Sequence, residues 1–140
     1  MRLAAVGLVL ALCPASLAAD PAKPVFAVSS VQDGLGGRIE LRADRRWSTQ
    51  SHAGRGDRGR LSRRAMKQFR ALLAAAPFAI VVDKACSAVD KEIVLVDFER
   101  DRFLKLEPPC VVADEATERI SHCLATLMYG GDPSDVCRVP

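Results

Sequence analysis

Histidine is the residue of this sequence best suited to acid–base chemistry, and the chain has two. Ser51 precedes His52 and could serve as its nucleophile, but neighbouring residues in a strand point to opposite faces and cannot hydrogen-bond as a catalytic pair. The sequence also contains no G-x-S-x-G elbow to present a nucleophilic serine. His122 lies beside Cys123 on a predicted helix, where a surface histidine is expected rather than a ligand. From these positions we predict that neither histidine is catalytic.

A run of alternating acids is the second group of chemically capable residues. Asp97, Glu99 and Asp101 are spaced so that a hairpin tip could bring them to one side, as in a carboxylate pair or a calcium site. Calcium, however, takes about six to eight oxygen ligands from an ordered loop. Arg100 and Arg102 interleave with the acids and are expected to neutralise them. A solvated hairpin is therefore the predicted structure.

The sequence shows no motif that binds a cofactor or a metal. Residues 34–37 are glycine-rich, yet they open a predicted strand, so no helix N-terminus is available to cradle a phosphate. No CxxC spacing exists, which disfavours a zinc site or a thioredoxin-like redox motif. Aromatic residues make up 5% of the chain, which argues against a base-stacking or carbohydrate-stacking surface. We predict no enzyme activity, no cofactor and no metal.

The first nineteen residues have the three-part layout of a secretory signal peptide. A positive start leads into the apolar run Leu3–Leu12, which is too short for a membrane-spanning helix of roughly 20 residues. Small residues then precede a predicted cleavage near Ala19. Acylation at Cys13 is disfavoured, because a bulky leucine precedes it. We expect an exported chain, periplasmic or extracellular, with residues 1–19 removed, a single domain over residues 20–140 and no transmembrane segment.

Four cysteines remain after the predicted cleavage. An even number in an exported chain predicts two disulfides. Cys86 and Cys110 flank a predicted two-strand unit, and the tail after the second helix can fold back to bring Cys137 to Cys123. The expected pairing is therefore Cys86–Cys110 with Cys123–Cys137. The alternative is Cys86–Cys123 with Cys110–Cys137.

Alternating and periodic apolar positions predict an α+β domain. Strands are expected at residues 25–31, 38–42, 47–52, 78–82, 93–98 and 103–106, and helices at residues 63–75 and from the cap at Asp114 to Gly130. Ser62 caps the first helix, and Pro77 ends it. This order favours a mostly antiparallel sheet of five to six strands, built from two hairpin units, with two helices packed on one face and disulfides stapling the domain.

Each helix is expected to bury one apolar stripe at helical spacing. The stripes comprise Met66, Phe69, Leu72, Leu73 and Ala76 in the first helix, and Ala116, Ile120, Leu124, Leu127 and Met128 in the second. Trp47, the single tryptophan, is either a core residue under the first helix or an exposed anchor on a basic surface. Residues 53–60 contain three glycines and three arginines and are expected to form a basic loop.

Charge is unevenly distributed along the chain. Residues 38–70 contain eleven arginine and lysine residues and three acids, a net charge of +8, whereas the chain from Ala71 onward has a net charge of −5. Arg63 and Arg64 oppose the dipole at the start of the first helix, which hints at an anionic partner. The alternative is that these arginines simply cover solvated outer faces. The candidate contact residues are Arg45, Arg46, Trp47, Arg55, Arg58, Arg60, Arg63 and Arg64.

Several short motifs occur in an order that resembles one known family. They are the strand Gly37–Leu41, the dipeptide Arg46-Trp47, the helix start Gly59–Ser62, the helix end Leu72-Leu73, and Phe78 followed by a cysteine-containing stretch and a late strand pair. Over about residues 34–128 the chain resembles emfourin-type small secreted bacterial proteins. That family includes an inhibitor of thermolysin-like metalloproteases. The four cysteines and the closing tail depart from the family pattern, so the resemblance assigns no inhibitory residue.

These observations favour a small exported binding protein without catalysis, and the resemblance implies that it is protease-inhibitor-like. The expected partner is a protein with an acidic surface, attracted by the arginine-rich residues. The alternative is a binder of an anionic polymer or a membrane surface through residues 38–70, whose affinity would fall as salt rises. A hydrolase that uses Asp97 and Glu99 is the remaining hypothesis. The sequence predicts no oligomeric state.

Overall fold

The structure is a computed structural model of the whole chain, and residues 23–31, 37–51, 54–82, 92–106 and 111–139 are described. The elements, in chain order, are β1 (Pro24–Val31), β2 (Gly37–Arg42), β3 (Arg46–Ser51), β4 (Arg58–Arg60), α1 (Arg63–Ala75), β5 (Ile80–Val82), β6 (Glu92–Asp97), β7 (Arg102–Leu106), β8 (Val111–Ala113) and α2 (Glu115–Met128). The predicted signal peptide with Cys13 lies outside the described residues, and so do His52, Cys86 and Cys110.

Six strands form one antiparallel sheet in the order β4-β3-β2-β1-β6-β7. The first four strands make a meander that steps outward from β1. The chain then crosses over through α1 and returns to pair β6 with the other edge of β1. Strands β5 and β8 form a separate two-stranded antiparallel sheet. This arrangement confirms the predicted α+β fold with a mostly antiparallel sheet.

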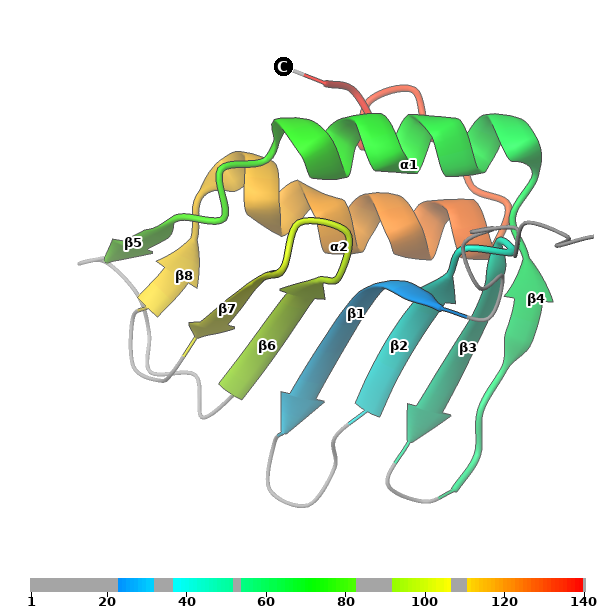
Figure 1. Cartoon of the computed structure of the whole chain (residues 1–140), viewed down its shortest axis with the longest axis horizontal. Coiled ribbons are helices and arrows are strands. Elements are labelled where there is room, and N and C mark those ends of the chain that lie inside the picture. Colours follow the sequence, from blue (N-terminus) through cyan, green and yellow to red (C-terminus); the bar gives the residue numbers. More distant parts are fainter. Residues whose placement is uncertain (1–22, 32–36, 52–53, 83–91, 107–110, 140) are drawn as a thin grey trace, which may run out of the picture.

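The two helices lie on one face of the six-stranded sheet and run side by side in opposite directions (Figure 1). α1 has the predicted bounds, because Ser62 Oγ accepts a hydrogen bond from Ala65 N at 3.0 Å and Pro77 follows the cap residue Ala76. All five residues of its predicted stripe are buried. No helix of the described part of the chain is long and apolar enough to cross a membrane.

The buried stripe of α2 differs slightly from the prediction. It comprises Thr117, Ile120, Cys123, Leu124 and Met128. Ala116 and Leu127, which the spacing places in the stripe, lie at its border and are half-buried. The stripe therefore includes a threonine and a cysteine, which an apolar pattern does not count. Both have an internal partner, since Thr117 is hydrogen-bonded and Cys123 forms a disulfide.

The sheet buries the face that looks towards the helices. Leu41 of β2 lies opposite Phe26 of β1 and Trp47 of β3, and all three side chains are buried. Leu95 of β6 pairs with Leu104 of β7 in the same way. Successive residues of a strand alternate between faces, so the residues between these positions point away from the helices. We call that second surface the open face, because no described helix or strand covers it.

The structure corrects the predicted basic loop at residues 53–60. Arg58–Arg60 forms β4, an edge strand in which Gly59 pairs with Trp47. A strand of three residues with glycine at its centre shows no apolar alternation, so the sequence gives no sign of it. Its pairing with β3 comes from tertiary structure.

The chain after α1 is also corrected. The strand predicted at residues 78–82 begins only at Ile80, and its partner β8 was not predicted. Phe78 has a φ of 54°, outside the strand region, and its N–H donates to Thr117 Oγ1 at 3.0 Å. A side chain of α2 thus holds the turn that the chain makes on leaving α1.

Asp114 joins this turn to the start of α2. Its carboxylate accepts hydrogen bonds from the N–H groups of Thr117, at 3.1 Å, and of Ala79, at 3.0 Å. Partial burial raises the pKa of Asp114, but these hydrogen bonds and that of the Thr117 hydroxyl outweigh it, so the pKa lies below its usual 3.8. The charged form is therefore the one that stabilises the fold.

We expect Asp114→Ala to lower the free energy of unfolding by about 1–2 kcal/mol at neutral pH, through loss of the helix cap. The stabilisation from ionised Asp114 is present above its unfolded-state pKa and is lost as the pH falls through the lower folded-state value. Urea titrations of the wild type and of Asp114→Asn, which keeps a capping oxygen without the charge, should therefore differ by a constant amount above about pH 5 and converge in more acidic solution. A difference that grew on acidification would contradict this account.

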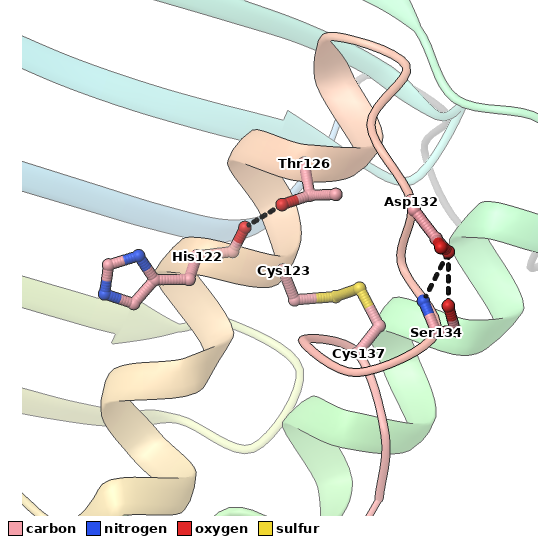
Figure 2. The surroundings of a disulfide bond; sticks show 6 residues. All are labelled: His122, Cys123, Thr126, Asp132, Ser134 and Cys137. Carbon is pink, nitrogen blue, oxygen red and sulfur yellow. Dashed lines mark hydrogen bonds between the residues drawn. A yellow bond between two sulfur atoms is a disulfide. The ribbon is translucent and has the colours of Figure 1, made fainter.

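One disulfide closes the C-terminal end of the chain. The tail after α2 folds back so that Cys137 reaches Cys123, with an S–S distance of 2.04 Å (Figure 2). Both cysteines are buried. This bond confirms the predicted Cys123–Cys137 pair and excludes the alternative pairing, whereas the expected partner pair, Cys86 and Cys110, lies outside the described residues.

Candidate functional site

Arginine dominates one half of the open face. Strands β2, β3 and β4 present Arg38, Arg42, Arg46, Arg58 and Arg60 together with Glu40, Ser48 and Gln50. We call this set the arginine half. All five arginines are exposed. Because each alternates with an inward-facing residue of its strand, the same periodicity that builds the core also gathers these charges on one surface.

Three of these arginines form a row across neighbouring strands. Arg46 of β3 lies directly opposite Arg60 of β4. Arg42 of β2 comes directly after Leu41, and Leu41 pairs with Trp47 of β3. Arg42 therefore lies opposite Arg46, on the side of β3 away from Arg60. Like charges that face each other across strands are destabilising. The fold nevertheless gathers three positive charges at the outer end of the sheet, and Glu40 and Asp44 are the acids beside them.

Glu40 is the acid at the centre of the arginine half. Its two carboxylate oxygens accept hydrogen bonds from Arg42 Nε at 2.9 Å and from Arg38 Nη2 at 3.1 Å. Burial raises the pKa of Glu40, but the hydrogen bonds and charges of the two arginines outweigh it and lower the pKa below its usual 4.5. An ionised Glu40 thus holds two guanidinium groups in place while the set keeps an excess of positive charge.

The remaining arginines of the set are less restrained. Asp44, in the β2–β3 turn, lies 3.6 Å from Arg46 Nε and accepts a hydrogen bond from Arg60 Nε through its backbone oxygen at 3.2 Å. Arg58 makes no side-chain hydrogen bond or ion pair within the described ranges, which end at residue 51 and resume at residue 54 on this side of the sheet. These side chains keep most of their N–H donors free for a binding partner.

A groove of about 810 Å³ runs along this part of the sheet. Its lining includes four arginines of the set, with Ser48, Gln50 and the residues of the β3–β4 hairpin. The hairpin lies close to β3, since a Cβ atom added to Gly56 would come within 1.8 Å of the Thr49 carbonyl oxygen. The groove thus combines a mixed polar and apolar lining, which includes Trp47, with four cationic side chains.

Position 59 favours glycine because the Trp47 ring packs directly against its backbone. A Cβ atom at Gly59 would lie 2.5 Å from the Trp47 ring. We expect Gly59→Ala to displace that ring and to lower the free energy of unfolding by about 1–3 kcal/mol, the usual cost of overpacking. Because the chain has one tryptophan, its fluorescence reports the displacement directly, and Ser48→Ala on the facing strand is a suitable control. An unchanged emission spectrum and unfolding midpoint in Gly59→Ala would contradict this packing.

The structure distributes the eight predicted contact residues over different surroundings. Arg46, Arg58 and Arg60 lie in the arginine half, Arg63 and Arg64 on the exposed side of α1, and Arg55 in the exposed β3–β4 hairpin. Arg45 has a φ of 71° and donates from Nη1 to the Leu61 carbonyl at 3.0 Å, so it supports the chain locally. The structure therefore brings three of the eight together.

Trp47 is 8% exposed and belongs to the core. Its ring lies 5.8 Å from that of Tyr129, whose hydroxyl donates to Asp57 Oδ2 at 3.2 Å. The tryptophan therefore positions the groove from below, and Tyr129 ties the end of α2 to the β3–β4 hairpin.

Sequence reasoning did not single out Arg38 and Arg42 as contact residues. Both lie in the predicted strand 38–42, where polar and apolar residues alternate, and that alternation already assigns them to one face with Glu40. What the sequence lacks is the order of the strands. Only the pairing of β2 with β3 and of β3 with β4 shows that the arginines of three strands share a surface.

The acidic residues of the β6–β7 hairpin form a structural cluster rather than a site. Asp97 is fully buried and pairs with Arg102 at 2.9 Å and Arg100 at 3.2 Å, so the prediction of a solvated hairpin is wrong for this residue. Glu99 pairs with Arg70 of α1 at 2.6 Å, and Asp101 is exposed. Within the described part of the chain, no group of three or more histidine, cysteine or acidic residues could hold a metal ion.

Comparison of the chain with protein-family models, with curated proteins and with solved structures finds no match. The arginine half is therefore the feature of the molecule that bears on its function.

Proposed function

We propose that this chain is a small exported binding protein, without catalysis of its own, that binds the acidic surface of a protein partner through its arginine half. The observation that carries the proposal is the row of Arg42, Arg46 and Arg60 on three adjacent strands. Glu40 and Asp44 offset part of their mutual repulsion, and carboxylates of a partner would offset the rest.

The choice of cation supports a protein partner. Every base of the arginine half is arginine, and none is lysine. The guanidinium group donates two parallel hydrogen bonds to a carboxylate, and arginine is enriched at protein interfaces whereas lysine is depleted. The Cys123–Cys137 disulfide supports export, since disulfides persist mainly in oxidising compartments. Inhibition of a thermolysin-like metalloprotease, implied by the emfourin-type resemblance, is one specific form of this proposal.

A matched pair of charge variants tests the proposal. The open-face variant carries Arg46→Glu, Arg58→Glu and Arg60→Glu, and the helix-face variant carries Arg63→Glu, Arg64→Glu and Lys67→Glu, so both lose the same charge. Each protein and the wild type are immobilised and exposed to the exported fraction of the source organism, after their unfolding midpoints have been compared. We expect an acidic protein to be retained by the wild type and the helix-face variant and lost by the open-face variant.

The purified partner should then bind the open-face variant at least about 100-fold more weakly than the wild type, since three charge pairs across an interface contribute roughly 1 kcal/mol or more each. Equal retention by all three proteins, or retention of no protein by the wild type, would count against the proposal.

A further inference from the structure

The open face has a second half of opposite character. Strands β1, β6 and β7 present on it Val94, Val96 and Phe103, with the buried Ala27 between the halves and the ion pair of Glu92 and Lys105 beside Val94. The apolar residues are Ala27, Val94, Val96 and Phe103. We call this set the apolar half. One register line crosses the whole sheet through both halves, from Arg58, Ser48 and Glu40 to Ala27, Val96 and Phe103. The arginine half and the apolar half are therefore adjacent parts of one continuous surface.

Phe103 is the protruding group of the apolar half. Its side chain is 71% exposed on the edge strand β7, whereas Val94 and Val96 beside it are half-buried. A single exposed apolar residue is ordinary, but this one adjoins further apolar residues and lies on a strand edge, where exposed apolar groups promote unwanted pairing. The fold gains no stability from that exposure. Aromatic side chains, phenylalanine included, are enriched at protein interfaces.

We propose that the partner contributes a protein segment of two-part chemistry, with carboxylates over the arginine half and a bulky apolar side chain against Phe103, Val94 and Val96. This inference rests on the proposed function and specifies its partner. Strands lie about 4.8 Å apart, so the three to five strand steps from the arginine half to β7 place the two parts of the segment about 14–24 Å apart. A helix covers that distance in roughly ten to sixteen residues.

The geometry favours such a segment over a polyanion or a lipid surface. A polysaccharide or nucleic acid would use the arginines but has no group to fill the apolar half. A membrane is reached by side chains that protrude, and of the apolar half Phe103 alone is exposed while the valines are recessed. A protruding side chain of a protein segment reaches the valines.

Selection from a displayed library of random 16-residue peptides tests the inference. The wild type should enrich peptides that combine several acidic residues with a bulky apolar residue about ten positions away. Phe103→Ser should enrich peptides that are acidic but have no such apolar residue, and the open-face arginine variant should enrich neither class. Phe103→Leu, which keeps an apolar side chain, is the matched control and should select the same peptides as the wild type.

Dissociation constants of the best peptide complete the test. Replacing its apolar residue by serine should weaken binding to the wild type about tenfold and leave binding to Phe103→Ser unchanged. Equal affinity of the wild type for both peptides, enrichment of purely acidic peptides, or no enrichment at all would overturn the inference. Tighter, Phe103-dependent binding to phosphatidylglycerol vesicles, or tighter binding to heparin oligosaccharides, would also overturn it. An unchanged peptide affinity in the open-face variant would instead reject the proposed function.

Discussion

Asp97→Ala should lower the free energy of unfolding by about 3 kcal/mol, near the lower end of the range for breaking a buried ion pair, because Arg100 and Arg102 keep partial contact with solvent. The Asp97 carboxylate is fully buried and accepts hydrogen bonds from Arg102 Nε and from the N–H groups of Glu99 and Arg100. Alanine would leave these donors without their acceptor in the interior.

The pair also connects the hairpin to α1. Arg102 donates from Nη1 to the Ala76 carbonyl at 2.7 Å and from Nη2 to the Leu73 carbonyl at 2.6 Å, so it caps the C-terminal end of the helix. Its guanidinium group lies 4.2 Å from the centre of the Phe78 ring. Asp97 positions Arg102 for all of these contacts, so its loss should loosen the end of α1 as well as the hairpin.

Urea unfolding of Asp97→Ala, Arg102→Leu and the double variant measures this coupling. The double variant should lose less free energy of unfolding than the two single variants lose in total, because it leaves no unpaired buried charge. Asp101→Asn, at an exposed position of the same turn, is the control and should change the stability by no more than about 0.5 kcal/mol. If Asp97→Ala cost no more than this control, the assigned role of Asp97 would be wrong.

Removal of the disulfide in Cys123→Ala/Cys137→Ala should lower the free energy of unfolding by about 3 kcal/mol, the chain-entropy value for a loop of this length. The two cysteines are 14 residues apart in sequence, and both lie in the core, so their loss frees a loop in the unfolded state and removes buried contacts. Replacing both residues avoids a buried free thiol. The slope of the free energy of unfolding against urea concentration should also become slightly steeper, because the unlinked chain unfolds to a more expanded state.

Ser134→Ala is the control for the tail, because Ser134 is exposed between Asp132 and the disulfide (Figure 2). It should stay within about 0.5 kcal/mol of the wild type. A loss below about 1 kcal/mol in the double cysteine variant would show that the tail is held mainly by other contacts.

The helices and strands that could be predicted are those whose bounds depend on the types of nearby residues. A serine cap and a proline stop define α1, polar–apolar alternation defines β2, and runs rich in valine define β1 and β6. The sequence could not reveal β4, since Gly59 is there to accommodate Trp47 of a different strand. The burial of Asp97 was missed because acids usually face solvent, although it continues the inward alternation of Ile93 and Leu95.

The site was predicted only in part, for a related reason. A net charge of +8 over residues 38–70 indicates a basic surface, but those residues divide between the open face and the outer side of α1. The apolar half was not predicted at all, because Phe103 and Val96 read as ordinary strand residues. That they adjoin the arginines follows from the pairing of β1 with β6, which joins strands about 70 residues apart in sequence.

The central claim is that acidic groups bind the open face rather than the basic side of α1. Its most direct test is an NMR titration of the isotopically labelled protein with a ten-residue oligoglutamate. We predict that the shifting amides lie in β2, β3 and β4, around Arg42, Arg46 and Arg60, and that the shifts shrink as salt is added. Shifts confined to the start of α1, around Arg63 and Arg64, or no shifts at millimolar peptide, would contradict the account.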